Sequence, residues 1–315
     1  MVPFITEDQT RKILNEKNSL VLARETFQLI AQKKVFMPPK MYLVLPASND
    51  FRAMPSFLEA PGGSECGIKW ISVFPKNAGK GQPTVNGTIL LSSADDGRLL
   101  AIMEANNITA MRTAATAVLA ASLMANPKPK IMALVGAGIQ AAYQLAAHAD
   151  LFDFDQIRVW GFEPNEAELF CKKHPSFKML RPVNDIKSCV ELADIIVTCT
   201  SSRKPLVQKE WVKLGAHINA IGADAKGKEE LDPALLMRAR VVVDEWEQAS
   251  HSGEINVPFS QGSFLKANVH AELSEVVSQA KNGRHAENEI TIFDSTGLGA
   301  LDIHFAQYVY ARTKV

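Results

Sequence analysis

Opposite charges balance in this sequence, which contains 34 basic and 34 acidic side chains. Because there is no net charge, nothing in the composition favours nucleic acid or an anionic membrane as a partner. No apolar run approaches the roughly 20 residues that a membrane span needs. The N-terminal segment MVPFITEDQT contains acids and lacks the apolar core of a signal peptide. We therefore expect a soluble, cytoplasmic protein with neither nucleic acid nor membrane as a partner.

The sequence also has few residues suited to disulfide or metal chemistry. Its 4 cysteines show no C-x-x-C spacing, and its 7 histidines are scattered without the spacing of metal ligands. The cysteines are Cys66, Cys171, Cys189 and Cys199. We expect these thiols to be reduced, the histidines to be structural and no metal to be bound.

What the sequence does contain is a glycine turn within residues 131–150, IMALVGAGIQAAYQLAAHAD. Ile131–Val135 is apolar and predicts a buried parallel strand, and an Ala-rich helical run follows the turn. The pattern G-x-G-x-x-A allows a tight turn at Gly136, close approach of a pyrophosphate at Gly138 and close helix packing at Ala141. An ordinary strand-to-helix corner is the alternative interpretation.

Strands and helices alternate through the rest of this half of the chain. Apolar strand-like runs recur at residues 157–160, 178–183, 194–199, 217–221, 240–244 and 290–294, with helical stretches between most of them. This alternation predicts an α/β fold with a doubly wound parallel (Rossmann) sheet. We place the dinucleotide-binding domain at residues 116–298, and a chain of 315 residues has room for a second domain.

The N-terminal part has a different pattern. Residues 6–34 show broken helical periodicity, with Thr6 as a candidate cap. Between residues 37 and 91 the chain is rich in Pro and Gly and contains β-like runs at 41–45, 67–74 and 88–92, with another at 99–103. A helical run from Ile108 ends at Asn126-Pro127. We therefore predict an α+β domain over residues 1–115, built on an antiparallel sheet.

Ligands of doubly wound sheets lie beyond the carboxyl ends of the strands, so the loops there are candidate binding segments. A ribose-binding acid usually lies about 20 residues beyond the glycine turn. Glu163 follows the second strand, 27 residues after Gly136 (163 − 136) and two residues past Gly161, the position where such an acid would ordinarily stand. This loop contains no Arg to bind a 2′-phosphate. The choice between NAD and NADP stays open, with NAD favoured through Glu163. A solvated loop acid is the alternative.

Hydroxyl groups and a second acid follow later strands. Thr198, Thr200, Ser201 and Ser202 suit hydrogen bonds to the ribose or nicotinamide side of a cofactor, or the capping of a following helix. Asp224 follows two small residues at the next strand end. This position suits a proton-handling group beside a substrate, or a helix N-cap.

Three cations stand beside predicted strands or a helix start in the N-terminal part. Lys69 interrupts an apolar strand, where burial would be costly without a partner. It predicts a group that holds a substrate carboxylate or another anion, whereas simple alternation would place it on a solvated face. Lys40 is a second cation beside a strand. Arg112 and Thr113 stand near a helix start, where a guanidinium, a hydroxyl and helix N–H groups suit a phosphate.

Taken together, these segments resemble the ornithine cyclodeaminase/μ-crystallin family over nearly the whole chain. The matching motifs are GIKWISVFPKN (67–77), ITAMRTAATA (108–117), LVGAGIQA (134–141), AHINAIGADAKGKEELD (216–232) and ITIFDSTGLGALD (290–302). Residues 239–256, ARVVVDEWEQASHSGEIN, look most like the archaeal-type alanine dehydrogenase branch of the family.

The resemblance implies a homodimer formed through the N-terminal domain, to which a C-terminal helix within residues 299–315 returns. It implies that Lys69 binds the substrate carboxylate and relays a proton, and that Asp224 is the acid/base beside the amino or imino nitrogen. It further implies that Arg112 reaches substrate and cofactor phosphate. The remaining implied cofactor ligands are Thr113 on phosphate and Gly136, Gly138, Ile139 and Gln140 around the pyrophosphate.

The chain departs from the family pattern at two places. Lys40 stands where the family commonly has an Arg for the carboxylate, and Lys keeps the charge but loses the bidentate fork. Ornithine cyclodeaminases have a Glu before the Met-Pro of the second strand, where this chain has Phe51-Arg52-Ala53-Met54-Pro55. The missing Glu argues against binding of a second amino group, and so against cyclodeamination.

We therefore expect an NAD(P)-dependent oxidoreductase acting at Cα of a small amino or imino acid. The reaction would be reductive amination of a 2-oxo acid, as in alanine dehydrogenase, or reduction of a ketimine such as pyrroline-2-carboxylate. One alternative is an ornithine or lysine cyclodeaminase that recycles NAD and releases ammonia. The other is a μ-crystallin-like protein that binds NADP or another ligand without turnover.

Overall fold

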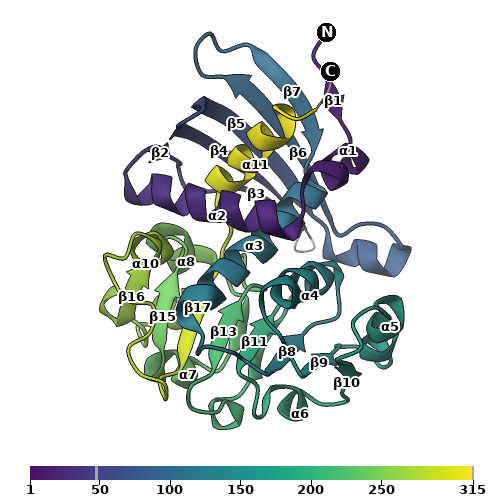
Figure 1. Ribbon diagram of the computed structural model, residues 1–315, viewed down its shortest axis with the longest axis vertical. Coiled ribbons are helices and arrows are strands. Elements are labelled where there is room, and N and C mark those ends of the chain that lie inside the picture. The colour runs from purple at the N-terminus through teal and green to yellow at the C-terminus, as the bar shows by residue number, and fades with distance from the viewer. Residues whose placement is uncertain (47–48, 314–315) are drawn as a thin grey trace. The chain divides into compact units, whose positions relative to one another are not determined.

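The structure is a computed structural model that describes residues 1–46 and 49–313. The chain forms two compact units, one made of Met1–Arg112 with Leu298–Val315 and the other of Thr113–Gly297 (Figure 1). The domain limits drawn from the sequence, 115/116 and 298/299, lie within three residues of these limits (115 − 112). The functions assigned to the two domains stay predictions.

The first unit is built on a mostly antiparallel sheet. Among the described residues its strands run in the order β1-β7-β6-β5-β4-β2, with β3 paired to β4. Their bounds are β1 Phe4–Ile5, β2 Val35–Phe36, β3 Met41–Leu45, β4 Asn49–Ala60, β5 Gly63–Val73, β6 Val85–Ser93 and β7 Leu99–Glu104. Helix α11 (Gly299–Tyr310) packs on β4, β5 and β6 and on α2 (Glu16–Ala31), so one sheet face is covered by helices (Figure 1).

Two sequence expectations for this unit need correction. The sequence pattern predicted no strand over β4, and only the family resemblance placed a second strand at residues 51–55. Pro55 is accommodated in β4 because β3 pairs with β4 only up to Ala53 and the pairing of β2 with β4 begins at Phe57, so the proline lies between the two partners. The predicted helical stretch 6–34 is two helices, α1 (Glu7–Ile13) and α2, which separate where Asn15 caps α2. Thr6 is the N-cap residue of α1.

The second unit is a parallel α/β sheet. Within the described part of the chain its strands run in the order β10-β9-β8-β11-β13-β17-β15-β16. Their bounds are β8 Ile131–Val135, β9 Gln156–Trp160, β10 Leu180–Pro182, β11 Ile195–Thr198, β13 His217–Ala220, β15 Arg240–Val243, β16 Val269–Glu272 and β17 Thr291–Asp294. The predicted doubly wound parallel sheet is confirmed. The strand β16 and a small sheet of β12 (Arg203–Val207) and β14 (Glu229–Leu231) were not predicted.

One helix, α3, precedes β8, and the other helices of this unit lie in the connections between these strands. Their bounds are α3 Asn106–Met124, α4 Ile139–Leu151, α5 Glu166–Lys173, α6 Ile186–Val190, α7 Pro233–Arg238, α8 Trp246–Ser252, α9 Asn256–Ser260 and α10 Leu273–Val277. The limit between the two units falls inside α3, between Arg112 and Thr113. None of the helices that the structure describes has both the length and the apolar character to cross a membrane.

The strand order reverses beside β8. From β8 the chain adds β9 and then β10 on one side, whereas β11 pairs with the other edge of β8 and β13 with β11. The ends of β8 and β11 lie together, because Val135 pairs with Thr198. In folds of this type the ligand binds at such a reversal, beyond the carboxyl ends of the strands.

Candidate functional site

The glycine turn lies at this reversal and has the shape that a phosphate site needs. Gly136 has φ +120°, and a Cβ there would lie 3.0 Å from the carbonyl oxygen of Cys199, so only glycine fits. Gly138 is the N-cap of α4, and a Cβ there would meet no described atom within 4 Å. Ala141 is fully buried in the core. Open space at a helix N-terminus fits a pyrophosphate.

Ile139 and Gln140 are the first two residues of α4, so the structure brings all four predicted pyrophosphate ligands to one turn. Ile139 is an apolar side chain that is 72% exposed. The role of these four residues as pyrophosphate ligands stays a prediction.

Glu163 lies in the exposed loop that follows β9, the strand next to β8. Its backbone N–H donates to Glu166 Oε2 at 3.1 Å. Gly161 lets the loop pass close to Glu166, because a Cβ at residue 161 would overlap the Glu166 side chain. Glu166 is thus a second carboxylate at this strand end, which the sequence analysis did not single out. The ribose-binding role of Glu163 stays a prediction.

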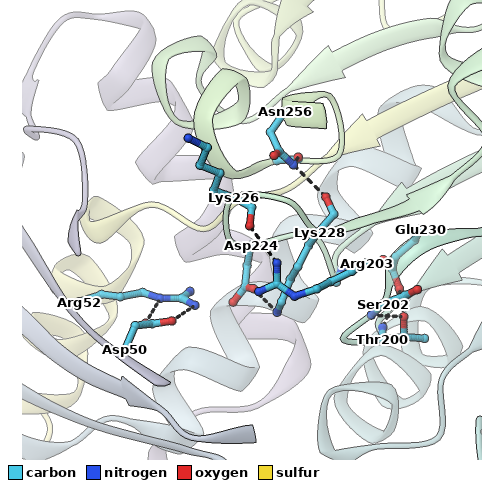
Figure 2. Close-up of polar contacts among 12 residues, drawn as sticks. Asp50, Arg52, Thr200, Ser202, Arg203, Asp224, Lys226, Lys228, Glu230 and Asn256 are labelled. Carbon is cyan, nitrogen blue, oxygen red and sulfur yellow. Dashed lines mark hydrogen bonds and ion pairs between the residues drawn. The ribbon is translucent and has the colours of Figure 1, made fainter. Parts of the chain in front are cut away.

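The hydroxyls after β11 are organised by a buried acid, Glu230. The backbone N–H and the hydroxyl of Thr200 both donate to Glu230 Oε1 at 2.7 Å, and the Gly222 N–H donates to Glu230 Oε2 at 2.9 Å (Figure 2). Ser201 and Ser202 are followed by the strand β12, so helix capping was the wrong alternative for these hydroxyls. One carboxylate therefore ties the ends of β11 and β13 together.

Glu230 belongs to a chain of buried carboxyl groups. Glu254 accepts hydrogen bonds from the backbone N–H groups of Glu230 at 2.8 Å and Leu231 at 2.7 Å, and Asp294 accepts one from the Glu254 N–H at 2.8 Å. Burial raises the pKa of Glu230, and burial together with Glu230 raises the pKa of Glu254 well above its usual range. No local sequence pattern pointed to this chain of carboxyl groups, because it joins segments far apart in sequence.

Asp224 lies in the loop after β13 and forms an ion pair with Lys228, at 2.6 Å from Oδ1 to Nζ (Figure 2). The Asp224 side chain is 34% exposed and that of Lys228 is 15% exposed. Asn256 holds this loop, since its Nδ2 donates to the Lys228 carbonyl and its Oδ1 accepts from the Gly227 N–H, both at 2.8 Å. All residues from 223 to 232 are described and none forms a helix, so the N-cap alternative for Asp224 was wrong.

A separate cluster of charges lies inside the first unit. Lys69 on β5 is fully buried, and its Nζ is 2.6 Å from Asp302 Oδ2 on α11. The other oxygen of Asp302 accepts from Nε of Arg112 at 3.1 Å, and Lys69 Nζ lies 3.4 Å from the hydroxyl of Thr109. The solvated-face alternative for Lys69 was therefore wrong, and the helix-covered face of the sheet holds it.

Burial dominates the electrostatics of this cluster. Burial, together with the positive charges of Arg112 and Lys40, lowers the pKa of Lys69 and Asp302 raises it, and the net result is a pKa of about 7. Lys40 precedes β3 and is half-buried. The three cations predicted for this part of the chain thus interact, and the acid that joins two of them, Asp302, had been assigned no role.

The expectation for Arg112 and Thr113 needs one correction. Both residues are buried, but α3 begins at Asn106, so they lie almost two turns inside the helix. The N–H groups of the helix start therefore do not reach them. Only their side chains are available to a phosphate, and that role stays a prediction.

In the residues that the structure covers, no three His, Cys, Asp or Glu side chains are grouped in a way that could hold a metal ion. The side chains that converge on the strand ends are instead hydroxyls, glycines and carboxylates, which suit an organic cofactor.

A glycine turn at the reversal point of a doubly wound sheet places the second unit in the class of Rossmann-type domains. The model of the ornithine cyclodeaminase/mu-crystallin family matches residues 6–315, and the chain belongs to that family. The chain is 39% identical over 310 residues to the alanine dehydrogenase of Archaeoglobus fulgidus, with 98% of this chain and 94% of that protein covered.

Two solved structures have the same fold over almost their whole length. One is an archaeal alanine dehydrogenase dimer with bound NAD, 38% identical with a TM-score of 0.93, with 98% of this chain and 95% of that chain covered. The other is the Δ1-pyrroline-2-carboxylate reductase of Thermococcus litoralis in complex with NADH and L-proline, 30% identical with a TM-score of 0.95 and full coverage of both chains (100%). The family expected from the motifs is confirmed.

Proposed function

We propose that the protein is an NAD(P)-dependent oxidoreductase that acts at Cα of a small amino or imino acid. The reaction is reductive amination of a 2-oxo acid or reduction of a ketimine such as pyrroline-2-carboxylate. The observation that carries this proposal is the buried Lys69–Asp302–Arg112 cluster, in a chain that also has an open glycine turn. Relatives with alanine dehydrogenase and pyrroline-carboxylate reductase activity support the same reaction class.

Lys69 and Arg112 bind the substrate carboxylate in this proposal. With Asp302 they form a buried group of two cations and one carboxylate. Ammonium and guanidinium groups are the side chains that bind a carboxylate by charge-assisted hydrogen bonds, so this group suits a substrate carboxylate. Lys40 adds positive charge nearby, although its single ammonium lacks the bidentate fork of an Arg.

The glycine turn, with Gly136, Gly138, Ile139 and Gln140, holds the cofactor pyrophosphate. When bound, the nicotinamide exchanges a hydride with the substrate Cα. Thr113 and Arg112 contribute to a phosphate, Thr200 and Ser201 to the ribose and nicotinamide side, and Glu163 to the adenosine ribose. We propose NAD as the coenzyme, because the loop of Glu163 offers carboxylates and no Arg, and because both solved relatives contain NAD or NADH.

Asp224 exchanges the proton on the substrate nitrogen, and Lys69 relays a proton from the carboxylate side. Lys228 holds the Asp224 carboxylate in one direction, and Asn256 fixes the loop that carries both. Hydride and proton transfer need reacting atoms within about 3.5 Å of each other.

The active form in this proposal is a homodimer that uses the outer face of the first sheet. This face carries exposed apolar side chains: Met41 is 67%, Leu43 53%, Trp70 43% and Leu90 37% exposed. Strand register places all of them on the face opposite Lys69. A contiguous exposed apolar face marks an interaction site, and one relative is a dimer. A cytoplasmic location fits the four free thiols and stays a prediction.

The experiment follows oxidation of NADH and of NADPH by the purified protein. The substrates are pyruvate with ammonia, pyruvate with methylamine, pyrroline-2-carboxylate and piperideine-2-carboxylate, and a parallel assay measures proline and ammonia from ornithine with NAD. We expect NADH oxidation with one of the oxo-acid or imine substrates. Proline and ammonia without net coenzyme change would instead make the protein a cyclodeaminase. Saturable coenzyme binding without turnover on any substrate would favour a binding protein.

A further inference from the structure

Asp302 joins three elements of the first unit at one point. It is fully buried on α11, and each of its carboxylate oxygens faces a different cation. Oδ2 lies 2.6 Å from Lys69 Nζ on β5, and Oδ1 lies 3.1 Å from Arg112 Nε on α3. Leu301 and Ile303 on either side are buried and apolar, so Asp302 is a charge within an apolar helix segment.

The other charged groups on this face of the sheet are engaged elsewhere. Glu65 accepts from His304 at 2.9 Å, His304 also lies 3.5 Å from Glu25, and Arg52 pairs with Asp50 at 2.7 Å. The strand partners of Lys69 are Met54 on β4 and Ile89 on β6, both buried and apolar. The charges that act on Lys69 are therefore those of Asp302, Arg112 and Lys40.

Building on the function proposed above, we propose that Asp302 is the positioning residue of the carboxylate-binding site. Its carboxylate lies between the Lys69 ammonium and the Arg112 guanidinium and holds the two cations side by side. Asp302 itself touches neither substrate nor cofactor. Its effect on the reaction passes through the two cations.

The physical reason is a balance of opposing effects on one ammonium group. Burial, Arg112 and Lys40 all lower the pKa of Lys69, and Asp302 raises it, with a result of about 7. Without Asp302 the ammonium would lose its proton below neutral pH, and a neutral amine cannot bind a carboxylate by charge. A group that both binds the carboxylate and relays a proton works best with a pKa near the operating pH.

Asp302 also fixes geometry. The Lys69 side chain is long and flexible, and its contact with one oxygen of the Asp302 carboxylate restricts it to one direction. The other oxygen of the same carboxylate binds Arg112. Because Asp302 belongs to the C-terminal helix, docking of α11 on β4, β5 and β6 completes the site. This assigns a functional reason to the return of the C-terminal segment to the N-terminal unit.

The direct test is the titration of Lys69 in the full chain, followed by NMR of protein labelled with [ε-13C]lysine. The Lys69→Met variant identifies the Lys69 signal. We expect this signal to titrate near pH 7 in the wild type, and Asp302→Asn to lower its pKa by at least one unit. Glu65→Gln is the matched control, since it removes a carboxylate from the same strand without touching Lys69, and it should leave the titration unchanged.

A kinetic readout complements the titration. With a substrate identified in the assays above, Asp302→Asn should raise KM for the carboxylate substrate and move the alkaline limb of kcat/KM to lower pH. Asp302→Glu, which keeps the charge, should recover part of both changes.

An unchanged Lys69 titration in Asp302→Asn overturns the inference, whether or not the protein turns over any substrate. If Asp302→Asn does not fold, Arg112→Gln provides the same decision. Removing the Arg112 cation should raise the pKa of Lys69. A constant or lower pKa would contradict the inference that Lys69 and Arg112 interact with the same Asp302 carboxylate. Failure of the proposed function is recognised separately, by absence of turnover in the wild type.

Discussion

At the scale of single residues, the proposed proton transfer by Asp224 depends on the ion pair that this carboxylate forms with Lys228. Its carboxylate pairs with Lys228 at 2.6 Å and is 34% exposed, so it is accessible to a ligand while its direction is held. We predict that Asp224→Asn lowers kcat by about 10²- to 10⁴-fold, the usual contribution of a proton-transfer group. Stopped-flow or steady-state NADH oxidation measures the change, with NADH affinity as the control.

Lys228→Met is the informative companion to Asp224→Asn. It removes the partner and leaves the carboxylate, so we expect a smaller loss, of about 10-fold, through misorientation. Turnover at the wild-type rate in Asp224→Asn would remove this residue from the mechanism. An equal loss in both variants would assign the effect to the ion pair rather than to proton transfer.

Single residues also show which parts of the candidate site could be predicted from the sequence. Lys69 stood out because a charge in an apolar strand needs a partner, but both faces of that strand are apolar, so alternation could not tell which face it occupies. The structure answers this through Asp302, which pairs with Arg112 across 190 positions. No local pattern connects side chains so far apart, although an acid among apolar helix residues was itself a signal of a buried partner.

At the scale of elements, a buried charge pair ties α11 to its neighbours. His304 on α11 donates from Nδ1 to Glu65 Oε2 on β5 at 2.9 Å, and its Nε2 lies 3.5 Å from Glu25 Oε2 on α2. Burial lowers the pKa of His304, but the two glutamates outweigh burial, and the pKa is raised above 6.5. A raised folded-state pKa stabilises the protein below the unfolded value of 6.5, and this stability is lost as pH rises through the folded value.

We therefore predict that His304→Gln destabilises the protein more at pH 5.5 than at pH 9. The pH-dependent part should be about 1–3 kcal/mol, the range of a charge-assisted hydrogen bond. Urea unfolding at the two pH values measures it. Equal losses at both pH values would mean that His304 acts by packing alone.

A second element-scale prediction concerns the carboxylate that joins the ends of β11 and β13. Glu230→Ala leaves the N–H groups of Thr200 and Gly222 without their acceptor, which should cost about 1–3 kcal/mol for each group. Because both loops lie at the predicted cofactor edge, NADH affinity should fall as well. Glu229→Ala on the same short strand is the control. Equal effects of the two variants would contradict the role of Glu230 in holding the two loops together.

Elements differ in how well the sequence foretold them. β8 was predicted with the same first and last residues that the structure shows, because an apolar run followed by two glycines fits few structures other than a strand that ends in a tight turn. β14 has only three residues, too few for any periodicity, so Glu230 on it could not be recognised as the organiser of the neighbouring loops. Local patterns thus gave the glycine turn and the sheet, while the contacts that hold the loops depend on tertiary packing.

At the scale of the whole molecule, the outer face of the first sheet is the feature that a single chain leaves unexplained. Trp70 stacks on Phe51 at 5.2 Å, yet it remains 43% exposed, and Leu90 on the next strand is 37% exposed. Apolar side chains of this size gain about 25 cal/mol for each Å² removed from water. A second copy of the same face is the partner that a two-fold symmetric dimer would supply.

We predict a mass of about 69 kDa in solution, twice the 34.5 kDa of one chain, by light scattering coupled to size exclusion. Placing a charge in the centre of the face with Trp70→Glu and Leu90→Glu should shift the mass to that of one chain, because a buried unpaired carboxylate opposes association. Val21→Glu is the matched control, since Val21 is 54% exposed on α2 and away from this face, and it should leave the dimer intact. A wild-type monomer, or a dimer that tolerates both glutamates, would assign the exposed face to another partner.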